Sequence, residues 1–126
     1  DLRWDPACDV AEVLDGPVDR SGLAEHGVTI EAAPTDHRPV APTVGYRISH
    51  EGRSVVCAGD TVPCEGLERL VRGADVYVQT VVRDDLIRAI GLPRLVDVCD
   101  YHSTAEQAAR TAAAGGVATL VLTHMV

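Results

Sequence analysis

Apolar and polar residues alternate along two stretches of the chain, which is the pattern of strands with one buried face. The first stretch, residues 28–32, reads Val-Thr-Ile-Glu-Ala, and the second, residues 44–48, reads Val-Gly-Tyr-Arg-Ile. The pair Glu51-Gly52 then allows a tight turn into the apolar run 54–58. Together these features predict a β-hairpin preceded by another strand. The first 25 or so residues show no sustained period and are predicted to form loop and a short strand.

Helical spacing appears in three later segments. Residues 63–73 place apolar side chains at helical intervals between a proline suited to a first turn and a glycine suited to a C-terminal cap. Residues 84–90 predict a second short helix that ends at Gly91, with the acidic pair Asp84-Asp85 as its N-cap. The third helix is the clearest and runs from Ser103 to the Gly115-Gly116 pair.

Two features define the third helix. Ser103 followed by Glu106 has the spacing of a capping box at the start of a helix. Alanines then recur with the periodicity of one buried helix face. This predicted stripe consists of Ala105, Ala108, Ala109, Ala112 and Ala113.

Residues 74–78 (Ala-Asp-Val-Tyr-Val) and 117–122 (Val-Ala-Thr-Leu-Val-Leu) are mostly apolar and predict two buried strands. From Ala58 onward, strands therefore alternate with helices, which implies parallel pairing with crossover connections. The hairpin before them adds antiparallel strands. The sequence therefore predicts an α+β fold with one mixed β-sheet and flanking helices.

Composition limits the size and the class of the protein. A chain of 126 residues supports one domain. Aromatic residues are 3% of the chain and Phe is absent, so Val, Leu, Ile and Ala must fill the core. The net charge of −8 argues against a broad basic surface for nucleic acid.

The chain shows no apolar stretch of membrane-spanning length and no signal-peptide pattern at its start. We therefore expect a cytoplasmic protein with no membrane partner. The four cysteines form no Cys-x-x-Cys pair, which favours reduced thiols. The chain begins without Met and stops directly after an apolar run, so we expect it to be part of a longer protein.

Three segments carry a metal-binding or proton-transferring residue at the end of a predicted strand or the start of a helix. These residues are Asp60 in Gly-Asp-Thr, His102 in Tyr-His-Ser-Thr, and His124 in a terminal Thr-His. Sheet enzymes gather their sites at strand ends, because side chains there leave the packed sheet and converge in a crevice. Each segment alone is more simply a turn, a helix-capping partner or a solvated residue.

Taken together and in this order, the segments resemble the metallo-β-lactamase-fold hydrolases of the ribonuclease Z group. The matching stretches are 58–63 (Ala-Gly-Asp-Thr-Val-Pro), 73–75 (Gly-Ala-Asp), 102–109 (His-Ser-Thr-Ala-Glu-Gln-Ala-Ala) and 120–124 (Leu-Val-Leu-Thr-His). Upstream, 36–40 (Asp-His-Arg-Pro-Val) followed by 44–48 is similar to the His and Gly-Tyr-Arg segment of that group. The resemblance implies that residues 1–126 form the C-terminal half of a four-layer αββα sandwich.

The resemblance also implies roles for individual residues. Asp60 would bridge two zinc ions and His124 would be a zinc ligand, since carboxylates and neutral imidazoles are good ligands for this metal. His102 would be a non-ligand catalytic residue that donates a proton to the leaving oxygen of a phosphodiester. The expected substrate-binding residues are Ser103 and Thr104 at the start of a helix, and His37 as a polar residue near the metals.

Two departures from the family pattern stand out. The His-x-His-x-Asp-His cluster that supplies most zinc ligands is missing from this chain, and a further ligand His of the family is unassigned. The family's His-Glu-Ala-Thr segment corresponds here to Gln79-Thr80-Val81-Val82, so the acidic partner of His102 is absent from that position. Asp97 or Asp100 could take its place.

The resemblance implies a zinc-dependent hydrolase with two ions in the complete enzyme, cleaving tRNA precursors at the 3′ end, and a homodimer. The fragment alone is expected to be inactive. One alternative is a hydrolase of small phosphodiesters, sulfates or esters, which the net charge and the altered segment favour. Another is a non-catalytic fragment that acts as a packing or dimerisation unit. A flavodoxin-like binding domain is a further possibility for the fold, but its site would follow the first strand.

Overall fold

A computed structural model describes residues 12–18 and 22–125 of the chain. Six strands form one sheet in sequential order, with antiparallel pairing from β1 to β4 and parallel pairing from β4 to β6. The strands are β1 (Gly16–Pro17), β2 (Val28–Pro34), β3 (Val44–His50), β4 (Arg53–Cys57), β5 (Val76–Thr80) and β6 (Thr119–Thr123). The predicted α+β class, the hairpin and the mixed sheet are confirmed.

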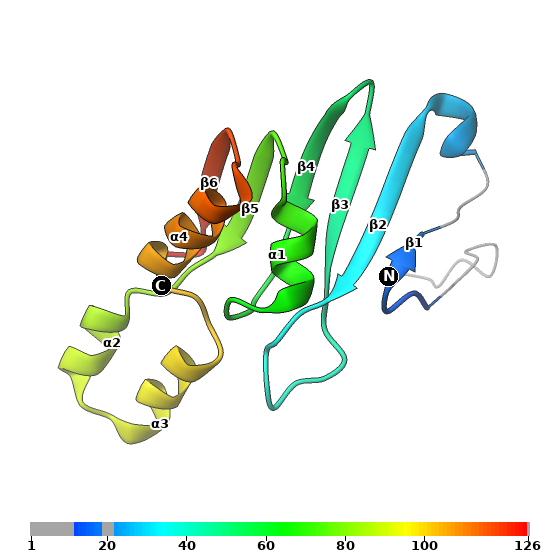
Figure 1. The fold of residues 1–126 in the computed structure, drawn as a ribbon. Coiled ribbons are helices and arrows are strands. Elements are labelled where there is room, and N and C mark those ends of the chain that lie inside the picture. Colours follow the sequence, from blue (N-terminus) through cyan, green and yellow to red (C-terminus); the bar gives the residue numbers. More distant parts are fainter. Residues whose placement is uncertain (1–11, 19–21, 126) are drawn as a thin grey trace, which may run out of the picture.

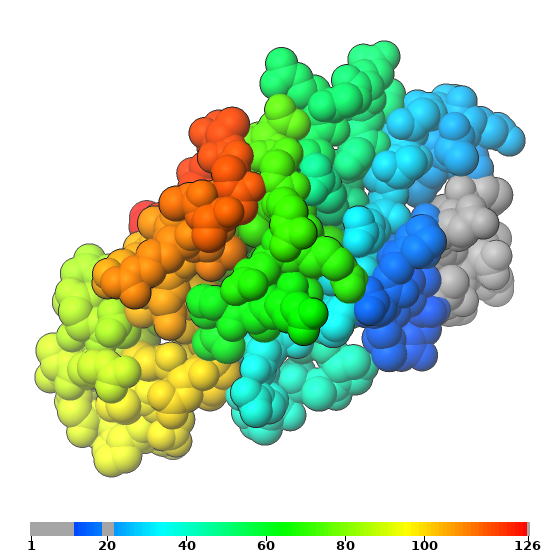
Figure 2. All heavy atoms as spheres, in the orientation of Figure 1, coloured from blue at the N-terminus to red at the C-terminus, as the bar shows by residue number. Residues whose placement is uncertain are grey.

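The helices fall into two groups. The long helix α4 and the shorter α1 pack on one face of the sheet, whereas α2 and α3 project from one end of the molecule (Figures 1 and 2). The helical elements are η1 (Ala24–His26), α1 (Glu65–Val71), α2 (Asp84–Ile90), α3 (Pro93–Val96), η2 (Asp97–Asp100) and α4 (Ala105–Gly115). No helix in the described part of the chain has both the length and the apolar character needed to cross a membrane.

The core lies between the sheet and the helices α1 and α4. Val56 and Tyr77 from the sheet pack with Leu67 and Leu70 of α1 and with Ala112 of α4. All of these side chains are buried, and aliphatic residues dominate the cluster, as the composition predicts. Burial of one such side chain contributes about 1.5–3 kcal/mol, so this cluster is the main source of stability on this face.

Two glycines let the helices approach closely. A Cβ at Gly66 of α1 would overlap the backbone carbonyl of Pro34 at the end of β2. A Cβ at Gly115 would lie 2.9 Å from the Val71 side chain. The chain therefore needs glycine at both positions to bring α1 against the sheet and against the end of α4.

The start of α4 differs from the prediction by one residue. Thr104 is the N-cap and forms a capping box with Gln107, so the prediction of Ser103 with Glu106 is wrong. Ser, Thr, Glu and Gln all suit a capping box, and two overlapping patterns in this sequence cannot be separated without the fold. The buried face is correspondingly rotated, because Ala108, Thr111 and Ala112 are buried while Ala105, Ala109 and Ala113 are exposed.

Further boundaries also shift. The N-cap of α2 is Arg83, with no side-chain cap, and Asp84 and Asp85 lie in the first helical turn, so the acidic N-cap prediction is wrong. Asp85 instead pairs with Arg83, and the negative charge at this helix end still opposes the helix dipole favourably. Strand β5 begins two residues later than predicted, because Gly73 and Ala74 form the turn that leaves α1. The strand also ends two residues later than predicted, so it includes Gln79 and Thr80.

The second face of the sheet is apolar and lacks a helix among the described residues. Strand pairing places Tyr46, Val55 and Val121 on this face, opposite the side that carries Val56 and Tyr77. These three side chains are 40%, 38% and 39% exposed, respectively. A sheet with two apolar faces needs a layer on both. The arrangement fits the expectation that the chain is half of a sandwich.

Candidate metal centre

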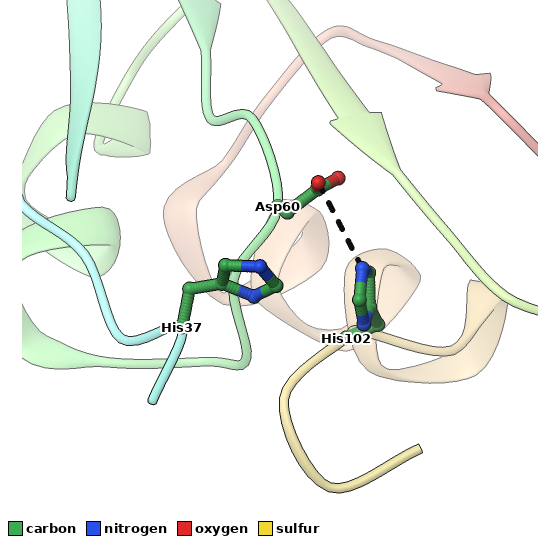
Figure 3. Close-up of side chains that lie close together, drawn as sticks. All are labelled: His37, Asp60 and His102. Carbon is green, nitrogen blue, oxygen red and sulfur yellow. Dashed lines mark ion pairs between the residues drawn. The ribbon is translucent and has the colours of Figure 1, made fainter. Parts of the chain in front are cut away.

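Three side chains from three separate segments converge beyond the ends of the strands. His37 follows β2, Asp60 follows β4, and His102 precedes α4. One potential ligand atom from each lies within 4.8 Å of the others (Figure 3). The shortest charged contact joins His102 Nε2 to Asp60 Oδ2 at 3.8 Å. Two imidazoles and a carboxylate are the nitrogen and oxygen donors that zinc takes in proteins, so this donor set fits the expected metal.

His124 lines a cavity next to this compact group but does not belong to the group. A cavity of about 210 Å³ is lined by Asp60, His102 and His124, together with Thr80 and apolar side chains. The three residues singled out from the sequence thus share one cavity, as predicted. His124 is exposed and has a φ of 62°, a left-handed conformation that costs energy for a residue other than glycine.

Thr61 ties the three segments together. Its hydroxyl accepts a hydrogen bond from the Asp36 backbone N–H at 3.0 Å, which fixes the loop that carries His37. Its carbonyl accepts a hydrogen bond from the Ser103 hydroxyl at 2.6 Å, which fixes the loop that carries His102. Thr61 itself is fully buried. The threonine of Gly-Asp-Thr is therefore the structural centre of the site, next to the residue that carries its chemistry.

Backbone carbonyls set the tautomers of both histidines. Nδ1 of His37 lies 2.8 Å from the Tyr101 carbonyl, and Nδ1 of His102 lies 3.0 Å from the Val98 carbonyl. A carbonyl can only accept, so each Nδ1 carries the proton and each Nε2 is left free. Metal-binding histidines are commonly oriented in this way by a carbonyl on the other ring nitrogen.

The structure answers which group orients His102. Among the described residues, the hydrogen-bond partner of its ring is the Val98 carbonyl, and neither Asp97 nor Asp100 takes that role. The suggestion that one of these two carboxylates replaces the missing acid is therefore wrong. The reason is that η2 turns the backbone, and not an acidic side chain, toward the imidazole.

The proposed phosphate-binding side chains have other partners in this structure. Ser103 is 1% exposed and its hydroxyl is bound to Thr61, so the substrate-binding prediction for this side chain lacks an accessible group. Thr104 caps α4 through its hydroxyl oxygen and remains partly exposed. Of the predicted trio, His37 is the one whose ring faces the metal-binding group.

Sequence reasoning missed two features of the site. Tyr101 packs edge-on against His37, with ring centroids 5.2 Å apart, and lies 4.9 Å from the His102 ring. The Tyr-His pair before a capping box was the available signal. The second feature is a hydrogen bond from the Thr80 hydroxyl to Asp60 at 2.6 Å, which no sequence pattern indicates.

Arg38 is next to His37 but is bound to Asp36. Its guanidinium contacts both carboxylate oxygens of Asp36. The hydrogen bond and the positive charge of Arg38 lower the pKa of Asp36 below its ordinary value. This pair stiffens the turn next to His37, with the Arg38 side chain largely accessible to solvent and the Asp36 side chain mostly covered.

Known proteins with similar sequences span more than this chain. Ribonuclease Z of Mycobacterium avium is 58% identical over 127 residues, covering 100% of this chain and 44% of that protein. Ribonuclease Z of Mycobacterium tuberculosis is 53% identical over all of this chain and 45% of its own length. The chain thus spans less than half the length of these curated relatives.

Solved structures and a family match agree on the fold. Human tRNase Z, short form, superposes with a TM-score of 0.61 at 25% identity, over 86% of this chain and 38% of that chain. The metallo-beta-lactamase fold protein YhfI from Bacillus subtilis gives a TM-score of 0.68 at 22% identity, over 92% of this chain and 42% of that chain. The family described as Beta-lactamase superfamily domain matches residues 6–125. The chain therefore belongs to the beta-lactamase superfamily.

Proposed function

We propose that the chain is the C-terminal half of a zinc-dependent phosphodiester hydrolase that cleaves tRNA precursors at the 3′ end. The observation that carries the proposal is the convergence of His37, Asp60 and His102 at the strand ends. The identity of 58% to a ribonuclease Z over the whole chain supports the substrate class. The cytoplasm is the expected compartment for such an enzyme.

The missing half would supply the remaining ligands and cover the second face of the sheet. Each zinc ion in a protein takes about four ligands. His37, Asp60 and His124 offer too few donors for two ions, so a complete site needs ligands from outside these segments. The exposed side chains of Tyr46, Val55 and Val121 offer the surface on which a second sheet would pack.

The residues of this chain divide the work of the reaction among themselves. Asp60 would hold the metals with its carboxylate, and His37 and His124 would add nitrogen ligands. Zinc, when bound, supplies Lewis-acid polarisation of water and of a phosphoryl oxygen. In its imidazolium form, His102 would carry a second proton on Nε2 and deliver it to the leaving oxygen, while the Val98 carbonyl keeps Nδ1–H in place. The exposed edge of Asp60 leaves room for the substrate.

The alternative hydrolase of small phosphodiesters, sulfates or esters rests on the net charge and on Gln79-Thr80. A charge of −8 opposes binding to a polyanion through this half of the protein. The basic residues needed for tRNA would then lie in the other half or in a second subunit of a homodimer. Turnover measured on both substrate classes separates the two functions.

The test uses the full-length protein with His102→Ala and Asp60→Ala variants, and His50→Ala at the end of β3 as a matched control. His102→Ala should lower kcat on a tRNA precursor by about 10²- to 10⁴-fold with zinc content near that of the wild type. Asp60→Ala should lose zinc and activity together. Zinc loss in His102→Ala would show that His102 is a ligand, and unchanged zinc in Asp60→Ala would contradict the proposed site.

A further inference from the structure

We propose that Thr80 is a positioning residue that fixes the Asp60 carboxylate for metal binding. The inference rests on the proposed role of Asp60 as a metal ligand. Thr80 is the last residue of β5, and Asp60 lies in the loop after the neighbouring parallel strand β4. The parallel pairing of these strands brings the hydroxyl and the carboxylate to the same end of the two strands.

The hydroxyl of Thr80 contacts two acceptors. Its Oγ1 lies 2.6 Å from Asp60 Oδ1 and 2.7 Å from the Gly59 carbonyl. A hydroxyl has one hydrogen to donate. The carboxylate is the stronger acceptor when it is ionised, because hydrogen bonds to a charged group are roughly twice as strong as neutral ones. An ionised Asp60, the form that binds metal, therefore draws this hydrogen.

A neighbouring amide satisfies the Gly59 carbonyl independently. The side-chain amide of Gln79 donates to that carbonyl at 3.1 Å and to the Thr80 carbonyl at 2.8 Å. Gln79 is fully buried, and its own oxygen accepts a hydrogen bond from the Tyr77 hydroxyl. Because Gln79 already serves Gly59, the Thr80 hydroxyl is left available for Asp60.

The contact determines which oxygen of Asp60 faces the histidines. With Oδ1 held by Thr80, Oδ2 points toward His102 Nε2, 3.8 Å away. Without the hydroxyl the carboxylate could rotate about its terminal bond, which has a broad energy minimum. The Asp60 side chain is 46% exposed, so packing alone does not hold it. Among the residues that the structure describes, Thr80 therefore provides the group that restrains this rotation.

This role accounts for the departure at residues 79–82. Where the resembled family carries His-Glu-Ala-Thr, this chain carries Gln79-Thr80-Val81-Val82. The polar side chains here serve the loop of Asp60, and the Val98 carbonyl orients His102 instead. The family's acid at this segment orients the catalytic histidine, whereas Thr80 in this chain contacts the carboxylate of Asp60.

The experiment compares Thr80→Val, Thr80→Ala and Thr80→Ser in the full-length protein, with Thr119→Val at the far end of β6 as the matched control. Zinc affinity is measured by competition with a chromogenic chelator, and thermal unfolding of the metal-free proteins checks the fold. Removal of an outer hydrogen-bond partner typically weakens metal binding about 10- to 100-fold, and we expect this for Val and Ala. Ser should restore affinity to within about threefold, since it keeps the hydroxyl.

Wild-type affinity in both Thr80→Val and Thr80→Ala would overturn the inference, as would an equal loss in Thr80→Ser. An Asp60→Ala variant measured alongside separates this failure from failure of the proposed function. If Asp60→Ala loses zinc while Thr80→Val retains it, the positioning role alone is wrong. If Asp60→Ala retains zinc, the metal site itself is wrong and the role of Thr80 falls with it.

Discussion

The hydroxyl of Ser103 donates a 2.6 Å hydrogen bond to the backbone carbonyl of Thr61, which lies 42 residues earlier in the chain. Both residues are buried, and each is adjacent to a residue with a proposed chemical role. Asp60 precedes Thr61, and His102 precedes Ser103. This hydrogen bond in the interior therefore joins the loop that carries the carboxylate to the loop that carries the imidazole.

Ser103→Ala should lower the free energy of unfolding, because the Thr61 carbonyl loses its side-chain donor in a buried setting. The expected loss is about 1–3 kcal/mol. Urea unfolding of the full-length protein measures it, with Ser49→Ala in β3 as a control. If Ser103 bound phosphate instead, the Ser103→Ala variant would show a raised KM and an unchanged unfolding midpoint. That outcome would contradict the structural role.

Much of the site could be predicted from the sequence because its residues sit at element ends. The ends of the strands before Asp60 and His124 were recognisable from apolar runs, and the topology of a mixed sheet brings such ends to one edge. The contacts between the loops could not be predicted. The hydrogen bonds of Thr61 and Thr80 join residues 20 or more positions apart. No sequence pattern indicates which group a side-chain hydroxyl will bind.

The errors at helix starts have a common cause. Capping by Thr104 instead of Ser103, and the acidic first turn of α2, depend on one residue of register. The sequence offers adjacent polar residues that suit either register, and the packing of the helix against neighbouring elements selects one. For α4 this packing is the contact of Gly115 with Val71, which a Cβ would obstruct.

Gly66→Ala should prevent normal packing of α1. The added Cβ would overlap the Pro34 carbonyl, and backbone on both sides leaves no flexible side chain that could move away. Overpacking of this kind typically costs about 1–3 kcal/mol and sometimes more. Thermal unfolding should show a larger loss for Gly66→Ala than for Gly115→Ala, where the nearest atom belongs to the Val71 side chain. Equal or negligible losses would mean that α1 lies farther from β2.

Asp75 should make the stability of the protein depend on pH in the acid range. The hydrogen bond from the Ser54 backbone N–H, with a further one from Arg53, lowers the pKa of Asp75 below its ordinary value of 3.8. A lowered folded-state pKa gives stability that is present above the unfolded-state pKa and lost as pH falls through the folded-state value. Asp75→Asn should therefore be less stable than the wild type at pH 7.

The difference between the two proteins should shrink below about pH 4, because the carboxylate is protonated first in the unfolded state and only at lower pH in the folded state. Urea midpoints of the wild type and Asp75→Asn at pH 7 and pH 3 provide the measurement. A gap of the same size at both values would show that the charge of Asp75 contributes nothing to folding.

The isolated chain of 126 residues should bind zinc weakly. Of the proposed ligands, His37 and Asp60 lie close together and His124 lines the same cavity as Asp60, whereas the two proposed ions would require about four ligands each. Titration calorimetry should show weak binding for the isolated chain and tight binding for the full-length protein. Tight binding of two ions per monomer would contradict this expectation. Light scattering on the same sample tests whether the ions are shared across a dimer.

The apolar second face of the sheet should make the isolated chain self-associate. Tyr46, Val55 and Val121 are exposed there on three strands, and contiguous apolar surface of this kind is normally covered in a folded protein. Light scattering should show the wild-type chain as an oligomer that binds a hydrophobic dye. Tyr46→Lys with Val55→Lys should shift the chain to a monomer and reduce dye binding, whereas Ala109→Lys on the exposed side of α4 should change neither.

In the full-length protein the same double variant should lower the melting temperature, because the charges would then lie between two sheets. A full-length protein that tolerates both lysines would show that this face is not the one covered by the other half.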